Sequence, residues 1–333
     1  MPIKRYDWID VAKGIGIILV VIGHSRLNTG IVARWIASFH MPLFFVLAGF
    51  CFDEMKYPTL AAYVKRKLEA LLYPYFTLSV LVVGMFQLLY IGDDSVFGVK
   101  ELFVEGTLKG STFGAFWFIT ALFCVEILYA GFARLVSHRI VLLCYMLLVS
   151  LESAYLINRH LPYFFDATLA ALFFYAFGHF LRSFYNKQSA VGALMWGISL
   201  VIMHGLILVF LYSYKPSFVG HDFGNPAIYF LCAILGTLSV MSVACFMSSR
   251  VKILSICKTP FAFLGKNTIV LLATHNALGV CRQSWIGKIP YMNGITSVLL
   301  ELILMGTLLW LFAEPCRFLI DFNVLRQLIR GRR

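Results

Sequence analysis

The feature that most constrains this chain is a series of apolar segments, each of about 17–24 residues, that recur from end to end. A helix of that length can cross a bilayer, where only helices and closed barrels satisfy the hydrogen bonds of the backbone. The segments do not alternate apolar and polar residues as barrel strands do. Hydrophobic residues fill 60% of the 333 positions and charged residues only 13%, too little charge for a soluble protein of this length. The sequence therefore predicts an all-α fold, a polytopic bundle of about ten transmembrane helices.

Ten spans can be placed on the sequence, with loops too short to hold a soluble catalytic domain. No low-complexity linker marks a second domain, so we expect a single integral-membrane domain over residues 1–333. Any chemistry must then occur in the membrane part. The predicted spans are residues 9–27, 36–52, 72–92, 113–131, 140–157, 163–181, 189–212, 226–248, 260–279 and 294–313.

The distribution of basic residues predicts the orientation of the bundle. If both termini face the cytoplasm, most of the 28 Lys and Arg residues fall in inner segments, as the positive-inside rule requires. The net charge of +12 follows from this bias. Because the charge is scattered over short loops, it does not indicate a nucleic-acid partner. The first apolar run lacks a small-residue cleavage site and is expected to be a retained anchor.

Three polar residues interrupt the first apolar run, and helical geometry places them on one face. Lys13 and His24 lie about 20° apart around the helix axis and roughly 16 Å apart along it. Asp10 falls within about 40° of His24 on the same count. Ionisable side chains inside a membrane helix are costly and are functional by default. The stripe predicts a polar groove inside the bundle, although a structural histidine bonded between helices would also fit His24.

Further motifs give the chain a family resemblance. Residues 39–49 read Phe-His-Met-Pro-Leu-Phe-Phe-Val-Leu-Ala-Gly, and the later stretches are Phe116-Trp117-Phe118-Ile119 and Leu264-Gly265-Lys266-Asn267-Thr268, followed by His275. Together with the Lys13 to His24 spacing, these motifs resemble the acyltransferase-3 family in its stand-alone form, the group of fucose 4-O-acetylase-like proteins. Two positions depart from the family pattern: Lys13 stands where arginine is more common, and Ala48 stands where serine is common.

The resemblance implies a membrane O-acyltransferase of the cell (inner) membrane. Its donor would be cytoplasmic acyl-CoA, most often acetyl-CoA, and its acceptor a sugar hydroxyl of a surface polysaccharide or lipid-linked glycan. Membrane lipid would be a further partner. No metal is expected, because His24, His40 and His275 lack the spacing of metal ligands.

Roles for individual residues follow from this chemistry. We expect His24 to be catalytic, either as the general base that deprotonates the sugar hydroxyl or as a transient acyl carrier. Asp10 is expected to act with it, by orienting Lys13 or by binding a polar part of the donor. Lys13, near the inner end of its span, is expected to meet the phosphates of the acyl-CoA.

Other residues are assigned to binding. Lys65 and Arg66 belong to the basic run 65–67, which the positive-inside bias alone would explain but which also suits the phosphates of acyl-CoA. His40, Trp117 and His275 are predicted to bind substrate, although an interfacial position would also account for His40, and aromatic packing or an interface belt for Trp117. Five further ionisable residues in spans are expected to face the bundle: Glu126, Glu152, His179, His204 and Glu301.

The alternative function is a polytopic transporter or flippase of a glycan or small metabolite. Many spans and intramembrane charge suit such a protein. It would be expected to carry an internal repeat, and no second copy of the Asp10–His24 block occurs in the later half. A sensory or assembly protein with a degenerate site also stays open.

Overall fold

The computed structural model describes residues 6–24, 29–53, 56–89, 117–157, 161–184, 190–249, 252–273 and 321–329, with isolated helical positions between 295 and 307. Within these ranges the regular structure is helical, apart from one isolated β-bridge between Ser217 and Asp222. The predicted all-α class is confirmed.

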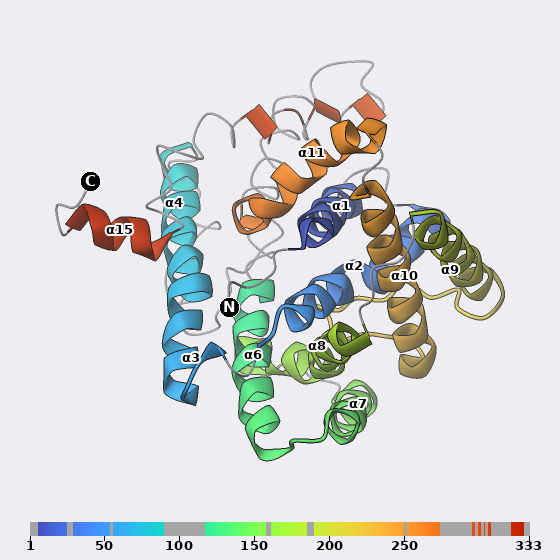
Figure 1. Ribbon diagram of the computed structural model, residues 1–333, viewed down its shortest axis with the longest axis horizontal. Helices are drawn as coiled ribbons and strands as arrows, with labels where there is room; N and C mark the ends of the chain where they lie inside the picture. Colours follow the sequence, from blue (N-terminus) through green and yellow to red (C-terminus); the bar gives the residue numbers. More distant parts are fainter. Residues whose placement is uncertain are drawn as a thin grey trace. The chain divides into compact units, whose positions relative to one another are not determined.

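The helices are shown in Figure 1. In chain order they are α1 (Asp7–Gly23), α2 (Gly30–Phe50), α3 (Leu60–Lys67), the π-helical turn η2 (Leu68–Leu72), α4 (Tyr73–Leu89), α6 (Trp117–Leu135), α7 (Arg139–Leu156), the 3-10 turn η4 (Pro162–Phe164), α8 (Phe165–Phe184), α9 (Ala190–Phe210), α10 (Pro226–Met247), α11 (Lys252–Lys266) and α15 (Phe322–Ile329).

The predicted spans follow these helices closely at the start of the chain and less closely at its end. Each of the first eight predicted spans overlaps one helix, from α1 to α10. The ninth was predicted to begin at Pro260, but α11 begins at Lys252 and carries Pro260 in its interior. The tenth span, 294–313, lies largely outside the described residues.

Six of the helices in the described ranges are long and apolar enough to cross a membrane. Helices α1 and α4 have 17 residues each, the lower limit for a spanning helix. The six candidates are α2, α6, α7, η4 with α8 (Pro162–Phe184), α9 from Val191, and α10. The prediction of ten spans therefore stays a prediction.

The chain forms two compact units. Unit 1 comprises Met1–Phe52, Phe132–His160 and Leu169–Thr268, and unit 2 comprises Asp53–Gly131, Leu161–Thr168 and Ile269–Arg333. The prediction of one domain over residues 1–333 concerns both units together and stays a prediction.

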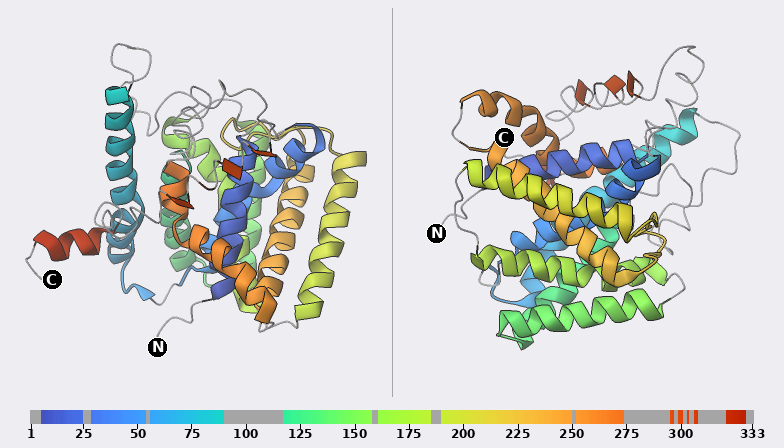
Figure 2. Two further views of the ribbon diagram at one scale, coloured as in Figure 1. Left: turned by 90° about the horizontal axis from the view of Figure 1, so that it is seen from above. Right: turned by 90° about the vertical axis from the view of Figure 1, so that its right-hand side faces the viewer.

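Helix α10 is central to unit 1, where it contacts α1, α2, α7, α9 and α11. Helices α9 and α10 lie side by side (Figure 2). On α10, Phe230 packs against Phe174 of α8 with ring centroids 4.8 Å apart, and Tyr229 beside it is fully buried. Aromatic side chains thus fill the space between α8 and α10.

Helix α9 turns a broad apolar face outward. Its exposed side chains are Val191, Met195, Trp196, Ile198, Val201, Ile202, Met203, Leu206, Val209 and Phe210. A continuous apolar face of this kind is unfavourable in water and stable against lipid tails. Its composition agrees with a membrane protein.

Two helix contacts in unit 1 bring backbones together without intervening side chains. A Cβ atom on Gly14 of α1 would overlap the Phe261 carbonyl of α11, and one on Gly265 of α11 would overlap the Asp10 carbonyl of α1. The same reciprocal pattern joins α2 to α8, where Gly49 meets the Tyr175 carbonyl and Gly178 meets the Val46 carbonyl. Small residues allow this close approach between membrane helices.

We expect Gly265→Ala to destabilise the protein by about 1–3 kcal/mol, because the added methyl group forces α11 away from α1. The measurement is the apparent Tm of the purified protein in detergent. Gly205→Ala is the matched control, since a Cβ there meets nothing within 4 Å. Equal Tm values for the two variants would contradict the close contact.

Candidate functional site

Helix α1 carries the polar stripe predicted from the sequence. It is α-helical from Asp7 to Gly23, so Asp10 and Lys13, three residues apart, lie on one face. Both side chains are half-buried among otherwise buried apolar neighbours. At the start of the helix, Asp7 pairs with Lys258 of α11 at 3.3 Å.

The position of His24 differs from the sequence-based expectation. Helix α1 ends at Gly23 rather than at residue 27, and His24 caps it, donating its backbone N–H to the carbonyls of Val20 and Val21 at 3.1 and 3.2 Å. The side chain is exposed, not buried inside the helix. The stripe is therefore followed by an exposed histidine just past the end of α1.

His40 lies on α2 close to this helix end. Its Nδ1 atom is 2.7 Å from the carbonyl oxygen of Ile36, one helical turn earlier. A Cβ atom on Gly23 would stand 3.5 Å from Cγ2 of Ile36, so the end of α1 packs against the turn of α2 that holds His40. The two histidine side chains are also close enough for the charge of His24 to act on His40.

A buried Ser38–His204 pair joins α2 to α9. The Ser38 hydroxyl donates to the Trp35 carbonyl at 2.8 Å, and its oxygen is 2.9 Å from Nε2 of His204. Since the hydroxyl has one proton, Nε2 must be the donor of the second bond. The pair therefore locks two helices together and does not activate the serine. Sequence analysis placed His204 in the bundle interior but missed its partner.

The segment 211–225 between α9 and α10 is anchored to unit 1 by several contacts. Nε2 of His221 donates to the Ser153 carbonyl of α7 at 3.0 Å, and Phe218 stacks on Phe45 of α2 at 5.6 Å. Tyr214 donates to Asp222, and this bond raises the pKa of the tyrosine. Phenol and carboxylate therefore stay paired at neutral pH.

Lys215, in this same segment, is a cation that sequence reasoning did not connect with the site. Its side chain is exposed and lies close enough to act electrostatically on His24. Only the fold brings it there, because 190 residues separate the two positions in the sequence.

The late motif lies against the polar stripe. Besides the contact of Gly265 with the Asp10 carbonyl, Asn267 donates to the Phe263 carbonyl at 2.9 Å and Thr268 donates to that of Gly265 at 2.6 Å. These bonds satisfy carbonyl groups at the end of α11. The motif thus shapes a helix end beside Asp10, while the Lys266 side chain is exposed.

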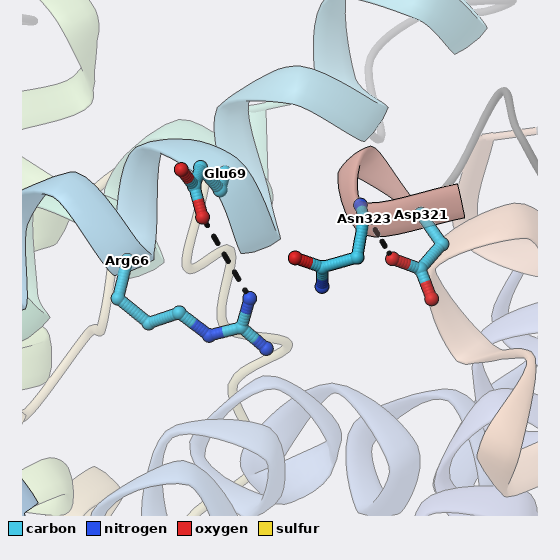
Figure 3. Close-up of polar contacts among 4 residues, drawn as sticks. All are labelled: Arg66, Glu69, Asp321 and Asn323. Atoms are coloured by element: carbon cyan, nitrogen blue, oxygen red, sulfur yellow. Dashed lines mark hydrogen bonds and ion pairs between the residues drawn. The ribbon is translucent and has the colours of Figure 1, made fainter. Parts of the chain in front are cut away.

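The three basic residues of the run 65–67, in unit 2, differ in exposure and in ion pairing. Lys65 and Arg66 are exposed, and Arg66 makes a loose pair with Glu69 at 3.9 Å (Figure 3). Lys67 instead reaches Glu126 of α6 at 2.6 Å, where the carboxylate side chain is only 5% exposed. The run leads directly into the π-helical turn η2, a feature that is frequent at functional sites. Only the first two cations are available to a ligand.

The last helix of the chain is held within unit 2. Asp321 accepts a bond from the backbone N–H of Asn323 at 2.9 Å and so caps α15 (Figure 3). The ring of Phe322 packs on Tyr73 at the start of α4, with centroids 5.1 Å apart. These contacts fix the first turn of α15 against α4.

The remaining predicted residues have varied surroundings. Trp117 is buried at the start of α6 and packs on Phe118 and Phe164. Aromatic packing therefore explains a tryptophan at this position. His275 and Glu301 lie outside the described residues.

Glu126, His179 and His204 are buried as predicted. The prediction for Glu152 is wrong, since its side chain is exposed on α7.

We expect Lys67→Ala to destabilise the protein by about 3–5 kcal/mol, because it removes the cation that lies 2.6 Å from the buried Glu126 carboxylate. Lys65→Ala, at an exposed position two residues earlier, should change stability by less than about 0.5 kcal/mol. Apparent Tm values in detergent measure both. If the double variant Lys67→Met/Glu126→Leu proved less stable than Lys67→Ala, the buried charge would not be the cause.

One of the comparisons with known proteins identifies the family. The model of a family described as an acyltransferase domain matches residues 6–314, which include all of the motifs above. No curated protein and no solved structure matches the chain. Since the match covers nearly the whole sequence, this chain belongs to the acyltransferase-3 family of membrane acyltransferases.

Proposed function

We propose that this acyltransferase moves an acetyl, or other short acyl, group from acyl-CoA to a sugar hydroxyl of a surface polysaccharide or lipid-linked glycan at the cell's inner membrane. The observation that carries the proposal is the stripe of Asp10 and Lys13 on α1, which leads to the exposed His24 at the end of the helix.

His24 supplies the chemistry that a sugar hydroxyl needs. In direct transfer the hydroxyl oxygen attacks the thioester carbonyl, His24 takes the hydroxyl proton, and the carbon–sulfur bond breaks. The CoA thiolate then leaves and takes up a proton. In the indirect route, the acyl group first resides on His24. Both routes need an accessible imidazole, and the exposure of His24 supports them.

The donor is held through its phosphates in this proposal. Lys13 provides a point charge on the stripe for these phosphates. Lys65 and Arg66, exposed at the end of α3, are separate candidates for phosphate binding within unit 2. Lysine lacks the planar fork of arginine, so a bidentate grip on phosphate is not expected from Lys13. The rise of roughly 16 Å along α1 between Lys13 and His24 suits the reach of a pantetheine arm between phosphate and thioester. In this proposal Asp10, three residues before Lys13 on the same helix, orients the lysine.

We expect His24→Ala to lower acyl transfer by about 10²–10⁴-fold, the usual contribution of a general base. Purified protein is given labelled acetyl-CoA and a glycolipid extract, and label in the glycan fraction is measured. His138→Ala, at an exposed position before α7, is the control and should keep full activity. Binding of acetyl-CoA without turnover in the unmodified protein would favour the transporter interpretation instead.

We propose that acyl-CoA is delivered from the cytoplasm to a bundle that has an even number of spans and both termini inside the cell. A green fluorescent protein fused to the C-terminus should therefore be fluorescent, and alkaline phosphatase fused at the same point should be inactive. The inverse pair of signals would place the C-terminus outside and contradict the orientation.

A further inference from the structure

The hydrogen bond of His40 determines which of its nitrogen atoms can accept a proton. The Ile36 carbonyl oxygen can only accept, so Nδ1 of His40, 2.7 Å away, must carry the hydrogen. A neutral imidazole has one N–H group, which leaves the lone pair on Nε2. Histidines that act as bases are commonly oriented in this way, through a bond from the other ring nitrogen.

His40 has the accessibility and the neighbours that a base in this site needs. Its side chain is half-buried, unlike the fully buried His204 on α9. The Gly23–Ile36 contact joins the turn that ends in His24 to the turn that holds His40. Each histidine is therefore adjacent to the same contact between α1 and α2.

A second base is required if the acyl group passes through His24. The nitrogen atom that carries an acyl group has no lone pair left to accept the proton of an attacking hydroxyl, and the lone pair of the other ring nitrogen points away from the acyl carbonyl. Another group near the carbonyl must take that proton, and such a group contributes about 10²–10⁴-fold to the rate.

We propose that His40 is a second catalytic residue, whose Nε2 takes the acceptor's proton while His24 carries the acyl group. This inference rests on the proposed function and selects its indirect route. A nitrogen of His24 first attacks the thioester carbonyl, the carbon–sulfur bond breaks, and the His24 proton passes to the departing CoA thiolate. The acceptor oxygen then attacks the acyl carbonyl, and its proton moves to Nε2 of His40. As the carbon–nitrogen bond breaks, His40 returns the proton to the freed nitrogen of His24.

Water can replace the sugar in the second step, so the inference can be tested without knowing the acceptor. Purified full-length protein is mixed with acetyl-CoA labelled in the acetyl group. Label bound to the chain after rapid quenching reports the first step, and the steady release of labelled acetate reports the second.

The decisive variant is His40→Asn. The amide N–H of asparagine can still donate to the Ile36 carbonyl, but the side chain has no basic nitrogen. We expect the variant to bind as much label per chain as the unmodified protein and to release acetate at least about 10²-fold more slowly. Added imidazole should restore part of the release, which a purely structural role of His40 would not allow. His24→Ala should bind no label.

The outcomes separate the inference from the function on which it rests. Normal acetate release by His40→Asn would overturn the role of His40, and so would a loss of labelling in that variant with folding intact. If the unmodified protein transferred label to glycans but never carried it, transfer would be direct and only this inference would fail. Absence of both labelling and transfer in the unmodified protein would overturn the proposed function itself.

Discussion

The contact between the backbones of α1 and α11 is the constraint on which the candidate site depends. Lipid tails are as apolar as the helix surfaces, so association of membrane helices relies on close packing and on hydrogen bonds between helices. Gly14 and Gly265 allow each helix to reach the backbone of the other without a side chain between them. Because Gly265 meets the carbonyl of Asp10 itself, this packing sets the position of the polar stripe.

Many residues of the family motifs contribute to helix packing and helix capping rather than to chemistry. Gly49 ends the motif of α2 at the Tyr175 carbonyl of α8, and the motif of α11 ends in side chains that cap its last carbonyl groups. The polar stripe of α1 supplies the candidate reactive groups, Asp10 and Lys13. The motifs therefore contain two kinds of residue. Some form close contacts between helices, and others are the candidate reactive groups that those contacts hold in place.

The charged residues also have two kinds of role, structural and available to a ligand. Lys67 and Glu126 form a tight pair with a buried carboxylate, and such pairs fix geometry more than they add net stability. Lys65 and Arg66, on the same turn, face solvent. Lys258 and Asp7 form a looser pair between α11 and α1. One basic run can thus supply both a structural cation and cations available to a ligand.

The sequence by itself determined the class of the protein and most of its helices. Hydropathy reports directly on the environment of a segment, so the first eight predicted spans each overlap a helix. Helical periodicity likewise placed Asp10 and Lys13 on one face, because that relation depends only on local geometry. The sequence did not reveal that α1 ends before His24. The end of a helix depends on capping and tertiary contacts as well as on apolar residues.

Relations between distant residues were decided by the tertiary structure alone. The approach of Lys215 to His24, the Ser38–His204 bond, and the contact of Gly265 with Asp10 all join positions far apart in the chain. Hydropathy and periodicity describe one segment at a time, whereas these contacts arise from the way several helices pack. The sequence thus determined which segments form helices, and only the packing of those helices decided which side chains meet.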